Sequence, residues 1–262
     1  MAEPAWSNEY YHDDENFELL VDEKRSGGRL RQTRQYAAAL ARSSNEAIQS
    51  IAMRLRSCAV FDRCGEGICP QCMSAEKRRF LERVEASLGQ TPLSSITIVP
   101  TADQFSRLSI PAVDIGNHKT YLKDIWVAAG LAPIPLIAGF DVSLEIFSGC
   151  VVGNMWSGHW HGLVPAEHEV AIKSRLGSFL PKTLLVAKPL LLKEITRTPN
   201  RAFSYRFKTL FDVHHRHVES FNRRRLVSWE IIRPTHPAFS ELARVLAEIG
   251  LTSRIIELGG RQ

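Results

Sequence analysis

Two histidines that share one face of a predicted strand could hold a divalent metal ion. His159 and His161 lie in the segment 156–164, whose composition and flanking turn residues predict a β-strand. Alternate residues of a strand project to the same side, so both imidazoles would point the same way. Two imidazoles placed in this manner can coordinate one ion, although two half-buried histidines without a metal are the simpler interpretation of the pair taken alone.

The preceding segment offers a carboxylate as a third ligand. Residues 139–147 also alternate like a strand. A turn near Val152 would set Glu145 opposite His159, at the separation of about 5 Å that cross-strand neighbours have. If the register slips by two residues, Asp141 becomes the competing carboxylate. We expect Glu145 to complete a site with open coordination positions, with Asp141 as the alternative.

Four closely spaced cysteines predict a second, closed metal site. The last two are separated by two residues, the usual spacing for two thiolates on one tetrahedral zinc, and Gly65 and Gly67 allow the tight backbone that such a loop requires. With four protein ligands no position stays open, so this zinc would be structural. The alternative is that some of these cysteines are small buried residues. The predicted ligands are Cys58, Cys64, Cys69 and Cys72, whereas Cys150 is expected to be incidental.

A tyrosine and a lysine three residues apart could form a nucleophilic pair. Tyr205 and Lys208 lie in the segment 201–221, whose apolar spacing predicts a helix. On that helix the pair would share a face away from the apolar stripe. The cation would favour the phenolate and could hold a phosphate. A surface tyrosine beside a cation is the alternative interpretation, and Tyr121, which also has lysines nearby, is the rival nucleophile.

Charge is distributed unevenly along the chain. Residues 1–23 contain eight acidic and no basic side chains, whereas residues 24–88 have 13 basic against 6 acidic and residues 171–233 have 14 against 4. Basic blocks of this kind suit a polyanion such as nucleic acid, although an ordinary solvated surface is the alternative. The candidate DNA contacts are Arg78 and Arg79 near the cysteines, and Arg206, Arg223, Arg224 and Arg225 after the histidine strand.

The composition is that of a globular protein and excludes a mostly disordered chain. The 262 residues are 44% hydrophobic and 23% charged. The N-terminal residues have neither the basic start nor the apolar run of a signal peptide, and the uncharged stretch 125–140 is short and contains two prolines. We therefore expect a cytoplasmic protein with no membrane partner, in which cysteines favour metal binding over disulfides.

Helices and strands that do not strictly alternate predict an α+β fold with a central antiparallel sheet. Strands are predicted over 94–100, 139–147, 156–164, 184–195, 226–232 and 253–258, and helices within 29–55 and over 74–88, 117–129, 167–179, 201–221 and 237–249. The expected organisation is a flexible acidic tail over 1–28 that ends in a linker at Ser26–Gly28, a helical and cysteine-rich segment over 29–90, a catalytic domain over 91–235, and a helix and strand over 236–262 packed on that domain.

Four segments within about residues 50–210 resemble, in the order in which they follow one another along the chain, the HUH-type rolling-circle replication initiators (Rep proteins) of plasmids and phages. The resemblance is carried by Ser95-Ile96-Thr97-Ile98-Val99-Pro100, by His159-Trp160-His161-Gly162-Leu163, by Tyr205-Arg206-Phe207-Lys208, and by Cys69-Pro70-Gln71-Cys72 with Lys77-Arg78-Arg79 after it. The last segment is similar to the zinc-binding region of one plasmid Rep subgroup. The resemblance implies an antiparallel sheet flanked by helices that carries a metal-dependent, site-specific nuclease for single-stranded DNA.

By this resemblance, His159 and His161 with a nearby acid would hold Mg²⁺ or Mn²⁺ on the scissile phosphate. Tyr205 would attack the phosphorus to leave a 5′-phosphotyrosyl link, and Lys208 would steady the phosphate or phenolate. The partners would be single-stranded DNA and the origin duplex, and a host helicase because the chain has no Walker phosphate loop. No second tyrosine lies near Tyr205, so a one-tyrosine mechanism is implied. The alternatives are a non-catalytic zinc-containing DNA-binding protein and an HUH relaxase or transposase with the same chemistry.

Overall fold

The computed structural model describes most of the chain from residue 23 onward. It covers residues 23–89, 91–100, 104–106, 113–148, 154–183, 186–195, 213–221, 224–232 and 236–259. For residues 23–26, 104–106, 147–148, 213–221, 224–232 and 236 it describes the backbone alone. The acidic residues expected to form a flexible tail therefore lie, up to residue 22, outside the described residues.

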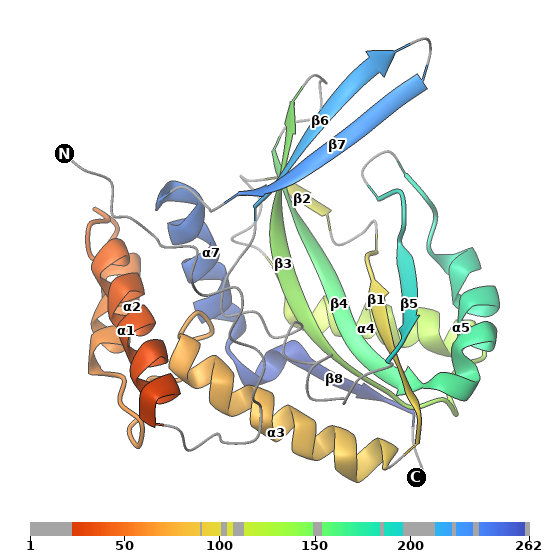
Figure 1. Cartoon of the computed structure of the whole chain (residues 1–262), viewed down its shortest axis with the longest axis horizontal. Coiled ribbons are helices and arrows are strands. Elements are labelled where there is room, and N and C mark those ends of the chain that lie inside the picture. Colours follow the sequence, from red (N-terminus) through yellow and green to blue (C-terminus); the bar gives the residue numbers. More distant parts are fainter. Residues whose placement is uncertain are drawn as a thin grey trace.

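Within the described ranges, eight strands form one sheet at the centre of the molecule (Figure 1). Six strands follow one another in the order β5-β1-β4-β3-β6-β7, while β2 pairs with β4 and β8 pairs with β3. All neighbours are antiparallel except β3 and β6, which run parallel. The strands are β1 Leu93–Ile98, β2 Gln104–Ser106, β3 Leu136–Ser148, β4 Met155–Pro165, β5 Leu190–Glu194, β6 Val213–Phe221, β7 Arg224–Ile232 and β8 Ile255–Leu258.

Helices flank this sheet, so the expected α+β class with a mainly antiparallel sheet is confirmed. The α-helices are α1 Glu23–Leu40, α2 Glu46–Ser57, α3 Pro70–Leu88, α4 Ile115–Ala128, α5 Glu169–Leu176 and α7 His236–Ile249. Short 3₁₀ turns are η4 Ala166–His168, η5 Gly177–Phe179 and η6 Thr252–Arg254. No helix in the described part of the chain is both long and apolar enough to cross a membrane.

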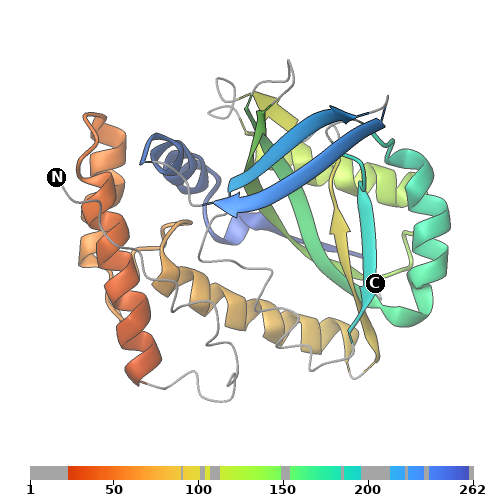
Figure 2. The same ribbon diagram turned by 45° about the horizontal axis from the view of Figure 1, so that its top comes forward.

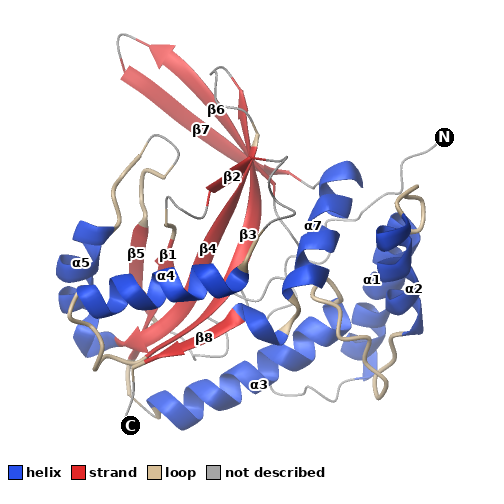
Figure 3. Ribbon diagram, turned by 180° about the vertical axis from the view of Figure 1, so that it is seen from behind, coloured by secondary structure: helices blue, strands red, loops and turns tan. Residues whose placement is uncertain are grey.

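The central strands divide their side chains between two faces. Asp141 pairs with His159, and Phe140 pairs with Trp160, so odd-numbered positions of β3 and β4 share one face and even-numbered positions the other. Helix α4 covers the even-numbered face (Figure 3), where the His118 ring stacks on Phe140 with centroids 5.4 Å apart. The histidine strand therefore has α4 on the side away from His159.

Helix α3 packs on the odd-numbered face, the face that carries Asp141 and His159. One buried cluster joins the helix to the strands, and it comprises Met73, Phe80, Val84, Leu88, Leu93, Ile137, Leu163 and Ile255. The sequence predicts this helix over 74–88, and the helix is present. It begins earlier than expected, at Pro70 with Cys69 as N-cap, instead of near Ser74.

Helices α1, α2 and α7 form a further layer beside the sheet (Figure 2). The spacing of Ile48, Ile51 and Leu55 favours a helix within 29–55, and all three residues are buried in α2. Tyr36 of α1 contacts Phe239 of α7 edge to face, with ring centroids 4.8 Å apart. The C-terminal helix is thus packed into the helical layer, while β8 adds to the sheet.

Two sequence-based expectations about elements are wrong. Ser26–Gly28 is not a linker, because α1 runs through it from Glu23. The expected helix over 201–221 ends as a strand, since β6 covers Val213–Phe221 and lies beside β3. Strands β6 and β7 form a hairpin that projects beyond the helices (Figure 1). The end of β3 needs a hydrogen-bonding neighbour, and this pairing overrides the helical spacing of the apolar residues.

Candidate metal centres

Cross-strand pairing places Asp141, and not Glu145, beside the histidines. Strand β3 pairs with β4 so that Asp141 lies opposite His159 and Gly139 opposite His161. Glu145 lies opposite Met155 instead. The expected register, which set Glu145 opposite His159, is therefore wrong, and Asp141, the alternative carboxylate, is the one that lies beside the histidines. Glu145 is buried farther along the same strand, where its Oε1 accepts a hydrogen bond of 3.2 Å from Ser143.

Asp141, His159 and His161 form a group that could hold a metal ion. Their ligand atoms lie within 4.8 Å of one another, and Oδ2 of Asp141 is 3.9 Å from Nε2 of His159. Atoms about 2.1 Å from one octahedral ion stand about 3.0 Å apart when adjacent and about 4.2 Å apart when opposite. Small side-chain adjustments would therefore let all three bind one ion.

Hydrogen bonds orient both imidazoles for coordination through Nε2. The Nδ1 atom of His159 lies 3.1 Å from the carbonyl oxygen of Ser157, which can only accept, so this nitrogen carries the proton. The Nδ1 atom of His161 lies 2.9 Å from Oγ1 of Thr97 on β1. For Nε2 of His161 to bind a cation, Nδ1 must donate its proton to that hydroxyl. Such outer contacts fix ring orientation in metal sites.

A buried arginine stands behind the carboxylate. Arg254 is 1% exposed, and its Nη2 donates to Oδ1 of Asp141 at 3.2 Å while its Nε donates to the carbonyl oxygen of Phe140 at 2.9 Å. The backbone nitrogen of Val142 also donates to Oδ1, at 2.9 Å. Oδ1 is thus held by two donors, and Oδ2 is the oxygen that approaches His159. Burial lowers the pKa of Arg254, which the negative charge of Asp141 opposes, and a guanidinium stays protonated in proteins.

Sequence reasoning missed Arg254. It precedes the apolar pair Ile255-Ile256 in a short C-terminal strand, and that position carries only a weak signal, a charged residue at the start of a buried segment. Its partner lies 113 residues earlier in the chain. Since β8 pairs with the first half of β3, the long-range strand pairing is what brings the arginine to the carboxylate.

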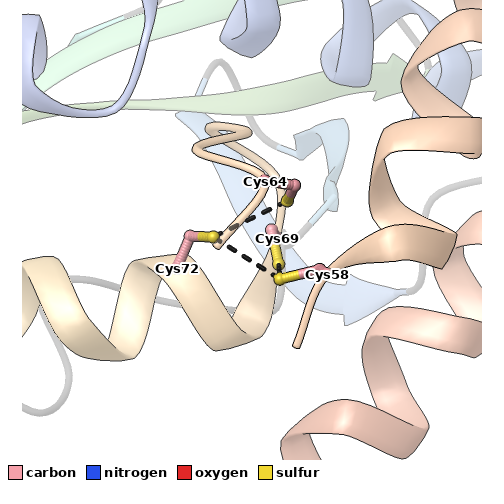
Figure 4. Close-up of side chains that lie close together, drawn as sticks. All are labelled: Cys58, Cys64, Cys69 and Cys72. Carbon is pink, nitrogen blue, oxygen red and sulfur yellow. Dashed lines mark hydrogen bonds between the residues drawn. The ribbon is translucent and has the colours of Figure 1, made fainter. Parts of the chain in front are cut away.

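The second group consists of four cysteine sulfurs that converge between α2 and α3 (Figure 4). The sulfur of Cys58 lies 3.5 Å from that of Cys69 and 3.7 Å from that of Cys72, and the Cys64 and Cys72 sulfurs are 3.6 Å apart. Four thiolates at about 2.3 Å from a tetrahedral zinc stand about 3.8 Å apart. The four predicted cysteines therefore come together with a spacing that fits a metal ion.

The thiols of this cluster have unlike affinities for protons. The pKa of Cys72 is lowered to about 4, because Cys64 and Cys69 donate hydrogen bonds to its sulfur, with a further contribution from the backbone nitrogen of Gly65 at 3.3 Å. The pKa of Cys64 is raised, because its proton is held between the sulfurs of Cys69 and Cys72 and because it is partly buried. One thiolate is thus already favoured, and a dication would favour the others.

The cysteine loop is packed tightly against α7. Gly67 lies so close to the backbone of Leu246 that a Cβ atom there would collide with the Leu246 carbonyl oxygen. Gly65 has a φ of 73°, in the left-handed region that favours glycine. Both glycines were expected to permit a tight loop, and the loop requires them for different reasons: one for a close approach, the other for its backbone conformation.

The basic side chains near the cysteines separate into two kinds. Arg54 pairs with Glu66, and Arg63 donates to the carbonyl oxygens of Val60 and Gln71, so these two arginines brace the loop. The predicted DNA contacts Arg78 and Arg79 are exposed on α3, with Arg79 also 3.2 Å from Glu76. Contact of these two arginines with phosphate stays a prediction from the sequence.

Several predicted site residues cannot be placed relative to these centres. Tyr205, Arg206, Lys208, Arg223 and the incidental Cys150 lie outside the described residues. Arg224 and Arg225 belong to β7, for which the backbone alone is described. The nucleophile and the basic path therefore stay predictions from the sequence. Comparisons with protein-family models, with curated proteins and with solved structures find no match.

Proposed function

We propose that this chain is a metal-dependent nuclease and strand transferase that nicks and rejoins single-stranded DNA, in the manner of HUH-type replication initiators. The observation that carries the proposal is the Asp141–His159–His161 group, with its three ligands on one face of a sheet. Three protein ligands leave positions open for a phosphate oxygen. A Mg²⁺ or Mn²⁺ ion held there would polarise the scissile phosphate, and two nitrogen ligands favour Mn²⁺.

The proposed reaction exchanges one phosphodiester bond for another. The phenolate oxygen of Tyr205 attacks phosphorus, the bond from phosphorus to the 3′ oxygen of the preceding nucleotide breaks, and that oxygen leaves as a hydroxyl after taking a proton. A 5′-phosphotyrosyl link remains. The reverse transfer rejoins the strand, so no nucleotide hydrolysis is needed. Lys208 would hold the phosphate or stabilise the phenolate.

The placement of two competing tyrosines supports this choice of nucleophile. Tyr36 is 4% exposed, packed edge to face on Phe239 in the helical layer. Tyr121 belongs to α4, which covers the face of the sheet opposite to His159. A phenol on that side cannot reach a phosphate bound at the histidines without crossing the sheet. Tyr205 remains the candidate with a neighbouring lysine in the basic segment after the histidine strand.

We propose zinc as the ion of the cysteine group and a structural role for it. Four thiolates saturate a tetrahedral ion and leave no position for substrate. The group joins the end of α2 to the start of α3, the helix that packs on the ligand-bearing face of the sheet. Its proposed contribution is to hold α3 in place and to present Arg78 and Arg79 to DNA.

The test is a search for a covalent protein–DNA adduct. The full chain is incubated with Mn²⁺ and 5′-labelled and 3′-labelled single-stranded oligonucleotides that cover origin candidates or randomised sequence. We expect the fragment on the 3′ side of the nick to become attached to the protein. The adduct should vanish with chelator, with His161→Ala and with Tyr205→Phe, which keeps the ring and removes only the oxygen.

The outcome also separates the alternatives. Sequence-tolerant binding of the oligonucleotides, with no adduct from any substrate and none with Mn²⁺ or Mg²⁺, would contradict the proposal and favour a non-catalytic zinc-containing DNA-binding protein. Mass spectrometry that places the nucleotide on Tyr121 would overturn the nucleophile alone. Adduct formation on transfer-origin or transposon-end substrates instead of replication origins would keep the chemistry and point to a relaxase or transposase.

A further inference from the structure

We infer that Arg254 keeps the Asp141–His159–His161 group electrically neutral, so that a divalent ion binds there strongly only together with an anionic phosphodiester. This inference rests on the proposed function for the identity of the anion. It assigns to Arg254 a positioning role that acts through Asp141, and it makes metal binding and DNA binding mutually dependent.

The charges of the group cancel in the absence of a ligand. Asp141 contributes one negative charge and the guanidinium of Arg254, 3.2 Å away, contributes one positive charge. His159 and His161 are neutral when they act as metal ligands. Arg254 forms an ion pair with Asp141, and the exposed fractions of the two side chains are 2% and 8%. Solvent therefore screens this pair very little.

The two oxygens of the Asp141 carboxylate face different partners. Oδ1 receives Nη2 of Arg254 and the backbone nitrogen of Val142, while Oδ2 faces Nε2 of His159. A cation bound at Oδ2 would gain the attraction of one carboxylate and suffer the repulsion of a guanidinium on the other side of the same carboxylate. Hard cations such as Mg²⁺ prefer several anionic oxygens.

A phosphodiester supplies the missing negative charge. Its oxygen could take one of the open positions, and its charge would restore the attraction that Arg254 removes. Mg²⁺ sites in phosphate chemistry commonly combine one or two carboxylates with oxygens of the substrate. An ion would then be held firmly when the DNA strand is in place and would exchange freely when it is not.

Orientation of the carboxylate is the competing role for Arg254, and it predicts the opposite sign. If the arginine served only to orient Asp141, removing it would weaken metal binding. If it serves to neutralise, removing its charge strengthens metal binding in the DNA-free protein, because the carboxylate then interacts with the ion alone. The sulfur of Met73 lies 3.6 Å from Nη1, and methionine removes the charge of Arg254 at similar side-chain length, so it is a suitable replacement.

The experiment is a Mn²⁺ titration followed by the electron paramagnetic resonance signal of free Mn²⁺, at pH 8, on the zinc-loaded full chain. All variants also carry Tyr205→Phe, which prevents strand transfer. The same titration of a His161→Ala variant, with and without oligonucleotide, measures the Mn²⁺ that binds to DNA and to other sites on the protein. We expect a single-stranded oligonucleotide to tighten Mn²⁺ binding by about tenfold or more. Arg254→Met should tighten DNA-free binding by a similar factor and reduce the enhancement by DNA, while Arg254→Lys, which keeps the charge, should resemble the parent.

Weaker or unchanged DNA-free Mn²⁺ affinity in Arg254→Met would overturn the inference. If Arg254→Met does not give a cooperative melting curve, Arg254→Gln is used in its place, because glutamine is neutral and can still donate a hydrogen bond. An adduct in the nuclease assay combined with unchanged Mn²⁺ affinity in these variants would refute only the neutral-site inference. Tighter Mn²⁺ binding in Arg254→Met, with no adduct from any substrate, would instead refute the nuclease and leave the role of Arg254 standing.

Discussion

The cysteine group and the Asp141–His159–His161 group give a metal ion opposite surroundings. The cysteine group gathers four sulfur ligands from 15 consecutive residues, whose loop lies between two helices and is packed on a third. The histidine group takes three candidate ligands from two strands, and the buried guanidinium of Arg254, at the end of η6, pairs with its one carboxylate. We propose that the cysteine group holds its ion permanently and that the ion of the histidine group binds and leaves together with DNA.

The two groups are physically connected by α3. The helix starts at the cysteines, and its residue Met73 lies 3.6 Å from the guanidinium that holds Asp141. Loss of the ion at the cysteines should therefore disturb both the helix and the carboxylate behind it. The cysteine group, which forms within one short segment, can therefore help to hold in place the histidine group, which forms only by long-range strand pairing.

The largest expected effect comes from removing the cysteine ligands. Cys69→Ser with Cys72→Ser should abolish zinc binding, from about one zinc per chain, because a tetrahedral site cannot be built from two thiolates in this loop. Loss of a structural zinc should cost at least about 3 kcal/mol, which at about 2–4 °C per kcal/mol lowers the melting temperature by about 6–12 °C. Elemental analysis and thermal melting measure both, with Cys150→Ser as the matched control. Unchanged zinc content in the double variant would refute the assignment.

The next effect distinguishes the two carboxylates on β3. Asp141→Asn should lower Mn²⁺-dependent cleavage by about 100-fold or more, because it removes the one anionic ligand. Glu145→Gln, at an equally buried position four residues along the same face, should change the rate by less than about threefold. Asparagine also leaves Arg254 without its counter-charge, which costs about 3–5 kcal/mol, so rates are compared well below the melting temperature of each variant. Equal losses in both variants would contradict the observed pairing.

The histidine pair and its face were predictable from the sequence, but the third ligand was not. Strand alternation has a period of two, so any even shift of β3 along β4 keeps every side chain on its face. The expected register, with Glu145 opposite His159, differs from the observed one by four residues and buries the same set of side chains. Patterning alone therefore cannot choose between Glu145 and Asp141.

Local elements were predicted better than long-range contacts. The helix face of Ile48, Ile51 and Leu55 and the four-cysteine group depend on neighbours in sequence, and both appear as expected. The segment 213–221 was expected to be helical, yet it pairs in parallel with the end of β3. Arg254 reaches Asp141 in the same way, through the pairing of β8 with β3. Periodicity carries no information about such partners.

A smaller effect tests how firmly the cysteine loop must sit on α7. Gly67→Ala should destabilise the protein by about 1–3 kcal/mol, because the new methyl group collides with the Leu246 carbonyl and the loop must move. Gly65→Ala is the matched control: its Cβ meets no atom within 4 Å, and it pays only the strain of a positive φ, about 1–2 kcal/mol. Chemical denaturation measures the stability. A chelator should also remove zinc faster from Gly67→Ala than from Gly65→Ala. The reverse order would show that the packing of this loop on α7 does not determine how long zinc is retained.

The smallest effect concerns a hydroxyl outside the ligand set. Thr33 of α1 is fully buried, and its Oγ1 lies 3.7 Å from the Cys69 sulfur and donates to the carbonyl oxygen of Arg29 at 2.9 Å. When Cys69 binds a cation its sulfur carries no proton, so the hydroxyl is the only donor of the two and can turn toward it. Thr33→Val removes this donor at similar size, and the loss of about 0.5–1.5 kcal/mol predicts zinc release to a chelator about two to tenfold faster. Thr33→Ser keeps the hydroxyl and should release zinc at nearly the parent rate. Equal rates for the valine and serine variants would show that the closed site owes its retention to its four ligands alone.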